Sequence, residues 1–131
     1  MIEINLFQVK DTEQIRAALA QATGLPVSVI LEAGAYWAVD SFDDVIGFEL
    51  VSDNVWNLLV VHTTNDSLEE DAVSITKELA RSLQEPCAVF DPHVATEDVL
   101  RIFYPDGRDV MGCLRQEDGR TTIEPVPIDM S

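Results

Sequence analysis

Between residues 54 and 90 the pattern of apolar and polar positions predicts a strand, a long helix and a second strand. The segment 55–61 is apolar on both faces, which is typical of a strand that lies centrally in its sheet or is covered on both sides. After it, apolar residues recur at spacings of three and four, which is one face of a 3.6-residue helical period. That face consists of Leu68, Ala72, Ile75, Leu79 and Leu83.

The ends of this helix are also predicted from local sequence. Ser67 and Glu70 have the spacing of a capping box, so we expect the helix to begin at Ser67. Pro86 ends it, because the residue before a proline is pushed out of the helical region and proline has no amide to donate. Residues 87–90 then form a short buried strand, and Leu79 should be buried between the helix and the sheet.

Residues 1–31 contain a second unit of the same kind. Alternation over 2–9 predicts a strand with one buried face, Asp11 should cap a helix, and Gly24 should end that helix in the left-handed conformation. Another strand is predicted at 27–31. The offset of sixty residues between the units favours two related strand–helix–strand halves, and chance explains it equally well. The coincident pairs are Ile15/Ile75, Leu19/Leu79, Ala20/Ala80, Pro26/Pro86 and Val29/Val89.

Five further strands follow from short apolar or alternating segments, and the turns at 105–107 and 117–119 indicate hairpins because each contains a glycine. In the second of these strands, Ile46, Phe48 and Leu50 should face the core. The elements together predict one α+β domain with two helices on a mostly antiparallel sheet of about seven or eight strands. A split βαβ, ferredoxin-like arrangement of the halves is one option. The five strands are 36–40, 45–51, 99–104, 109–115 and 121–126.

The charge of the chain narrows the choice of partner. Its 131 residues carry 24 Asp and Glu against 8 Lys and Arg, a formal net charge of −16. Such a field opposes every phosphate contact, so it argues against binding to nucleic acid or anionic membranes and favours a basic protein partner. The apolar content of 47% is that of a folded domain with its own core.

Location and redox state are expected to be those of a cytoplasmic protein. The chain opens without a positively charged leader segment, and no window approaches the ~20 apolar residues of a membrane span. Cys87 and Cys113 each fall in a predicted strand. They are expected to be buried thiols, with a disulfide between them as the alternative.

Catalytic motifs are absent from the sequence, which lacks HExxH, paired CxxC, GxSxG, a Walker loop and GxGxxG. His62 and His93 are the two histidines. With Asp91 and Cys87 they form a thiol or metal site only if the fold brings all four together, and isolated strand-end and loop histidines are the simpler interpretation. We therefore expect no catalytic turnover, no cofactor and no metal.

Asp40, Asp43, Asp44 and Asp53 surround a predicted hairpin and offer the oxygen ligands that calcium prefers. An EF-hand that starts at Asp40 needs a glycine at position 45 and a glutamate at position 51, where this chain has valine at both. Solvated turn acids are therefore the simpler interpretation of each residue taken alone.

Taken together, the acidic residues have a functional interpretation. They fall in four groups, at 40–53, 66–71, 91–98 and 117–129. An inhibitor of a basic enzyme uses such a surface to steer fast encounter and to occupy the substrate groove. Phe42 either anchors that contact or packs back onto the sheet. The candidate partner-binding residues are Asp40, Phe42, Asp43, Asp44 and Asp53.

In size, acidity, α+β layout and lack of catalytic motifs, the whole chain resembles bacterial immunity proteins that neutralise polymorphic or contact-dependent toxins. This resemblance implies a non-catalytic inhibitor that blocks a toxin active site. Residues 15–63 also resemble the first half of acidic type III secretion chaperones, a family that implies a homodimer binding an extended effector segment. The second resemblance rests on Leu19-Ala20, Gly24-Leu25-Pro26, Glu32-Ala33-Gly34 and Phe42-Asp43-Asp44 before paired strands.

Overall fold

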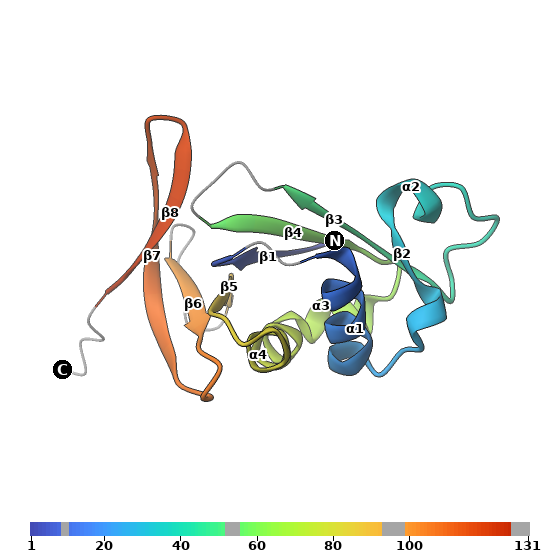
Figure 1. Cartoon of the computed structure of the whole chain (residues 1–131), viewed down its shortest axis with the longest axis horizontal. Helices are drawn as coiled ribbons and strands as arrows, with labels where there is room; N and C mark the ends of the chain where they lie inside the picture. The colour runs from blue at the N-terminus through green and yellow to red at the C-terminus, as the bar shows by residue number, and fades with distance from the viewer. Residues whose placement is uncertain (9–10, 52–55, 93–98, 127–131) are drawn as a thin grey trace.

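The computed structural model describes residues 1–8, 11–51, 56–92 and 99–126, and within them the chain forms one open eight-stranded sheet (Figure 1). The strand order is β2-β3-β4-β1-β5-β6-β7-β8. Neighbouring strands are antiparallel except for the parallel pair β2 and β3, so the predicted α+β class with a mostly antiparallel sheet is confirmed. The strands are β1 (Ile2–Leu6), β2 (Ile30–Glu32), β3 (Ile46–Val51), β4 (Asn57–His62), β5 (Cys87–Val89), β6 (Val99–Phe103), β7 (Asp109–Glu117) and β8 (Arg120–Pro125).

Two long helices, α1 (Thr12–Thr23) and α4 (Ala72–Leu83), pack against each other on one face of the sheet (Figure 1). The ends of α1 are as predicted. The Asp11 carboxylate accepts a hydrogen bond of 2.8 Å from the Gln14 amide, and Gly24 ends the helix with a φ of 77°, which favours glycine. The short helical elements are η1 (Val27–Val29), α2 (Ala33–Tyr36) and α3 (Asp66–Glu70).

The start predicted for the central helix is wrong. Asn65, not Ser67, is the capping residue, and its side-chain oxygen accepts from the Ser67 amide at 2.9 Å. The helical segment begins earlier because the short Asn65 side chain reaches the amide two residues ahead. It is also interrupted at Asp71, whose φ of −89° and ψ of 11° separate α3 from α4.

Two predicted strands are also corrected. Residues 27–31 form η1 and then β2, and the strand expected at 36–40 is absent because the chain forms α2 and a turn there. Tyr36, Trp37 and Val39 favour strands, but Tyr36 is 2% exposed and packs directly on Gly47 of β3 from the helical conformation. Tertiary packing therefore decides the conformation of this segment.

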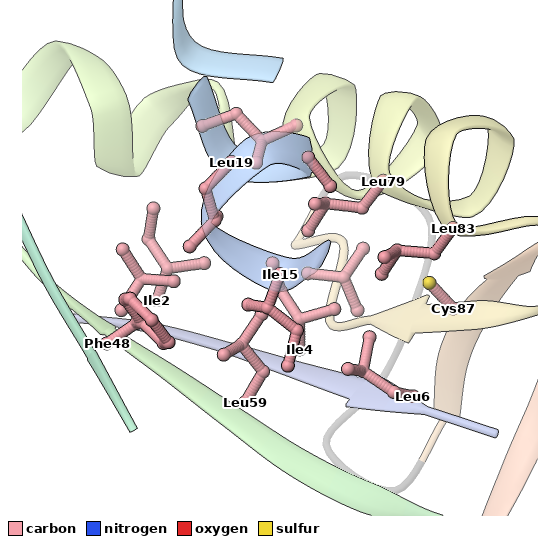
Figure 2. Packing of buried hydrophobic residues seen from close by; sticks show 14 of the residues in the cluster. Ile2, Ile4, Leu6, Ile15, Leu19, Phe48, Leu59, Leu79, Leu83 and Cys87 are labelled. Carbon is pink, nitrogen blue, oxygen red and sulfur yellow. The ribbon is translucent and has the colours of Figure 1, made fainter. Parts of the chain in front are cut away.

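The main core lies between the helices and the sheet (Figure 2). From α4 it includes Ile75, Leu79 and Leu83, with Leu68 and Ala72 partly buried beside them, so the predicted helical stripe is confirmed. The residues predicted for β3 also agree, since Ile46 and Phe48 are buried and Leu50 packs against the same cluster. The strands β1, β3 and β4 supply Ile2, Ile4, Leu6, Ile46, Phe48, Leu59 and Val61.

The second strand–helix–strand unit is a split βαβ arrangement. Both β4 and β5 pair antiparallel with β1, so they run parallel to each other on its two sides while α4 lies between them in sequence. The first unit differs, because β3 and β4 separate β1 from β2 in the sheet. The two units are therefore alike in their parallel strands and unlike in the number of strands inserted between them.

A smaller core lies on the opposite face, against β5, β6 and β8. It includes Trp56, Ala88 and Ile102, and Ala88 points away from its neighbours Cys87 and Val89, as strand alternation requires. Gly112 lies under this cluster, where a Cβ atom would come within 2.5 Å of the Ile102 Cδ1 atom. A larger residue at position 112 of β7 would therefore have to displace the side chains of Ile102 and Ile123. The cluster comprises Trp56, Ala88, Leu100, Ile102 and Ile123.

Both cysteines are free, so the expected thiols are present and the alternative of a disulfide is wrong. Burial raises the pKa of the Cys87 thiol, and the negative charge of Glu85 raises it further. Cys113 is only partly buried, so the expectation of a buried thiol is confirmed for Cys87 alone. Because the thiolate is the reactive form, the two thiols should differ strongly in reactivity.

We expect a thiol reagent at pH 8 to modify Cys113 in the native protein about a hundredfold or more faster than Cys87. Absorbance-monitored labelling of a Cys113→Ser variant and a Cys87→Ser variant separates the two rates. Denaturant should make the rates equal, because unfolding exposes both thiols. Equal rates in the native protein would contradict the burial of Cys87.

Candidate partner-binding site

Described acids from three of the four acidic groups lie on the same side of the sheet, at one end of its strands. The strands β4 and β5 run antiparallel to β1 and β3. The C-terminal ends of β4 and β5 therefore lie on the same side of the sheet as the N-terminal ends of β1 and β3. The segments 40–45, 63–71 and 90–92 therefore come together there, although they are far apart in sequence. We call this the acidic edge, and its described carboxylates are Asp40, Asp43, Asp44, Asp66, Glu69, Glu70, Asp71 and Asp91.

An aromatic cluster lies beside the acidic edge, on the sheet face away from α1 and α4. Tyr36 is 2% exposed and lies directly on Gly47, where a Cβ atom would come within 2.4 Å of the Tyr36 Cγ atom. Only glycine at position 47 leaves room for the ring, and the ring in turn fixes α2 over β3. The cluster comprises Tyr36, Trp37, Phe42 and His62.

The ring contacts of Phe42 agree with the second of its two alternatives, packing onto the sheet. Its ring centroid lies 4.9 Å from that of Tyr36 and 5.8 Å from that of Trp37, so Phe42 packs back onto the sheet through Tyr36. Trp37 is the exposed member, with 61% of its surface accessible. Large aromatic side chains held by neighbouring rings are typical binding anchors. Trp37 is therefore more accessible to a partner than Phe42 is.

Asp43 and Asp44 border a cavity of about 330 Å³ that we call the anchor pocket. The loop that carries them is held in place by the Thr64 hydroxyl, which donates to the Phe42 carbonyl at 3.3 Å. The pocket is mainly apolar, with polar side chains at its border, which is typical of ligand sites. It is lined by Leu25, Pro26, Val29, Asp43, Asp44, Val45, Ile46, Thr63, Asn65 and Leu68.

The proposed grouping of His62, Asp91 and Cys87 is not present. The His62 Nε2 atom lies 3.0 Å from the Glu49 Oε1 atom, and its ring stacks on Tyr36, on the face away from the helices. Cys87 lies in the main core on the helix face. His93 lies outside the described residues. Within the described part of the chain, no three His, Cys, Asp or Glu side chains come together as a metal site would require.

Asp91 has a structural partner within the fold. It is 3% exposed, and Arg101 donates to it from Nη1 at 3.1 Å while donating from Nε to Asp109 at 2.7 Å. The Arg101 guanidinium thus balances the charge of Asp91 and ties the segment after β5 to β6 and β7. Asp40, Asp43 and Asp44 are exposed, so they are more available to a partner.

Asp53, the fifth candidate residue, lies outside the described residues. The fourth acidic group begins on the hairpin of β7 and β8, the last two strands of the sheet. In the described ranges, none of the helices has the length and apolarity needed to cross a membrane. No family model, curated protein or solved structure matches the chain.

Proposed function

We propose that this chain is an acidic, non-catalytic binding protein that inhibits or neutralises a basic protein partner, as a toxin-immunity protein does by blocking an active site. The observation that carries the proposal is the acidic edge itself. The loop that carries Asp43 and Asp44 borders an apolar pocket, and Phe42 of the same loop contacts the exposed ring of Trp37 with ring centroids 5.8 Å apart. Carboxylates that can attract a basic partner therefore lie beside apolar surface that can hold it.

The clustering of carboxylates supports a binding role because folding gains nothing from it. Like charges brought to one edge repel each other and destabilise the compact state. They do, however, speed encounter with a positively charged surface. Many basic enzymes use lysine and arginine side chains to hold anionic substrates, so an acidic edge can occupy the same groove.

The alternative function is that of a secretion-type chaperone, a homodimer that holds an extended effector segment. A second copy of this chain would carry the same net charge of −16, so the acidic edge does not favour self-association. We therefore place inhibition of a basic partner first. The identity of the captured partner separates the two functions.

The test uses the immobilised full chain to capture its partner from cells of its source, with identification by mass spectrometry. We expect a basic protein whose activity falls when the purified chain is added in equimolar amount. Trp37→Ala should then weaken the purified complex about tenfold to a hundredfold in a titration, because a central aromatic anchor is lost.

Phe7→Ala is the matched control, since Phe7 is 43% exposed and follows β1 at the opposite edge of the sheet. The affinity of the Phe7→Ala variant for the partner should stay within about twofold of that of the unmodified protein. A partner that is acidic, or whose activity is unchanged in the complex, would overturn the proposal. An unchanged affinity for Trp37→Ala would remove the acidic edge as the binding surface.

A further inference from the structure

A second cavity lies on the other side of α3 from the anchor pocket. It has a volume of about 780 Å³ and separates α3 and the first turn of α4 from the segment after β5. Carboxylates of α3 line one wall, and the rest is apolar apart from Asp91, with Phe90 leaving 44% of its surface exposed. The cavity is lined by Asp66, Glu69, Glu70, Ala72, Val73, Phe90, Asp91 and Pro92.

We propose that this cavity, the arginine cleft, receives an arginine side chain of the basic partner, a proposal that rests on the proposed function. The apolar lining accommodates the methylene stem, and the carboxylates of α3 pair with the guanidinium. Leu68 lines the anchor pocket and Glu69 lines the cleft, so α3 forms the ridge between them. One partner can therefore place an apolar residue on one side of α3 and an arginine on the other.

The lining favours arginine over lysine. A guanidinium is planar and weakly hydrated, so it stacks on an aromatic face and enters a partly apolar cavity more readily than an ammonium. Phe90 supplies the aromatic surface. Asp66 and Glu70 supply carboxylates that make no ion pair with any described residue, while Glu69 pairs with the ammonium of Met1 and Asp91 with Arg101.

The chain already uses this combination of groups for its own arginines. The Arg101 guanidinium lies 4.9 Å from the centroid of the Phe103 ring while it bonds to Asp91 and Asp109. Arg108 repeats the arrangement with Tyr104 and Asp106. The arginine cleft offers the same two groups, an aromatic ring and carboxylates, without an arginine of the described chain lining it.

The test is an NMR titration of the ¹⁵N-labelled full chain with N-acetyl-arginine amide as the probe. N-acetyl-lysine amide and the neutral isostere N-acetyl-citrulline amide are the comparison probes. We expect the arginine probe to shift the amides of 66–73 and of Phe90 and Asp91 along saturable curves. The lysine probe should bind more weakly, and the citrulline probe should cause no saturable shift.

Two variants and one control locate the probe. Glu70→Gln should weaken the arginine probe about threefold and Phe90→Leu about two- to fivefold, because each keeps the side-chain size and removes a charge or a ring. Glu13→Gln removes one charge at the start of α1, and it should leave the affinity unchanged. Each variant is checked for fold by its amide spectrum.

Linear shifts, shifts spread equally over residues 40–44, or an equal effect of Glu13→Gln would overturn the proposal, because they indicate general attraction of cations. Equal binding of the lysine probe would overturn the selectivity for arginine. The proposed function has its own test in the captured partner and Trp37→Ala. If that test succeeds while the arginine probe does not bind, only the arginine cleft is rejected.

Discussion

Replacing Leu79 with alanine is expected to lower the free energy of unfolding by about 2–5 kcal/mol. Leu79 is fully buried, and Figure 2 shows it pointing from α4 into the core shared with Ile15 of α1 and Ile4 of β1. Truncation removes apolar contacts on several sides of the side chain. It also leaves a cavity, because neither the helices nor the sheet can move far enough to fill it. Equilibrium unfolding in urea, monitored by circular dichroism, measures the change.

Lys77→Ala is the control for that measurement, since Lys77 is exposed on the same helix and alanine favours helix. Its free energy of unfolding should stay within about 0.5 kcal/mol of the original. If Leu79→Ala also stays within that range, α4 does not pack on the sheet as described. If both variants lower the free energy of unfolding, the helix α4 is sensitive to substitution at any position and the result does not report on the core.

The elements that sequence predicted well are those in which local pattern and tertiary packing agree. Ile75, Leu79 and Leu83 follow the helical period and face the core, and Asp11 and Gly24 carry the chemistry of helix ends. The central helix was predicted two residues too short because Asn65 competes with Ser67 as the cap. Capping residues so close together are hard to rank from sequence, since both side chains can accept from a nearby amide.

The candidate site was predicted only in part, because it depends on contacts between distant residues. Asp40, Asp43 and Asp44 were identified from charge, and the structure places them at the acidic edge. Trp37 was missed because it was assigned to a strand. The signal that could have found it is Gly47, an isolated glycine within a strand, which often marks the close approach of another group. Its partner, Tyr36, could not be identified without the fold.

The meeting of three acidic groups could not be predicted without the strand order. Whether residues after β4 and β5 lie at the same edge depends on β1 lying between them, and no local pattern fixes that pairing. The same holds for the anchor pocket, whose lining comes from the segment before β2, the start of β3 and the segment after β4. The chemistry of the site was visible in the sequence, and its location was not.

The triple reversal of Asp40, Asp43 and Asp44 to lysine is expected to slow association with the basic partner about tenfold to a hundredfold at low salt. These three exposed carboxylates lie at the loop beside the anchor pocket, so their reversal turns attraction at the acidic edge into repulsion. The salt dependence of association should flatten, because the interaction that salt screens over about 8–10 Å is gone. Stopped-flow mixing at two salt concentrations measures both effects.

Dissociation of the same complex should change less, because retention depends on buried apolar contacts more than on long-range charge. Trp37→Ala should show the reverse pattern, with faster dissociation and nearly unchanged association. Phe42→Ala should also speed dissociation, since the Phe42 ring supports that of Trp37. The control reverses the exposed acids Glu13, Asp106 and Glu124, which changes the net charge equally outside the acidic edge. If this control slows association as much as the first triple reversal, attraction comes from the total charge and the acidic edge has no special role in steering.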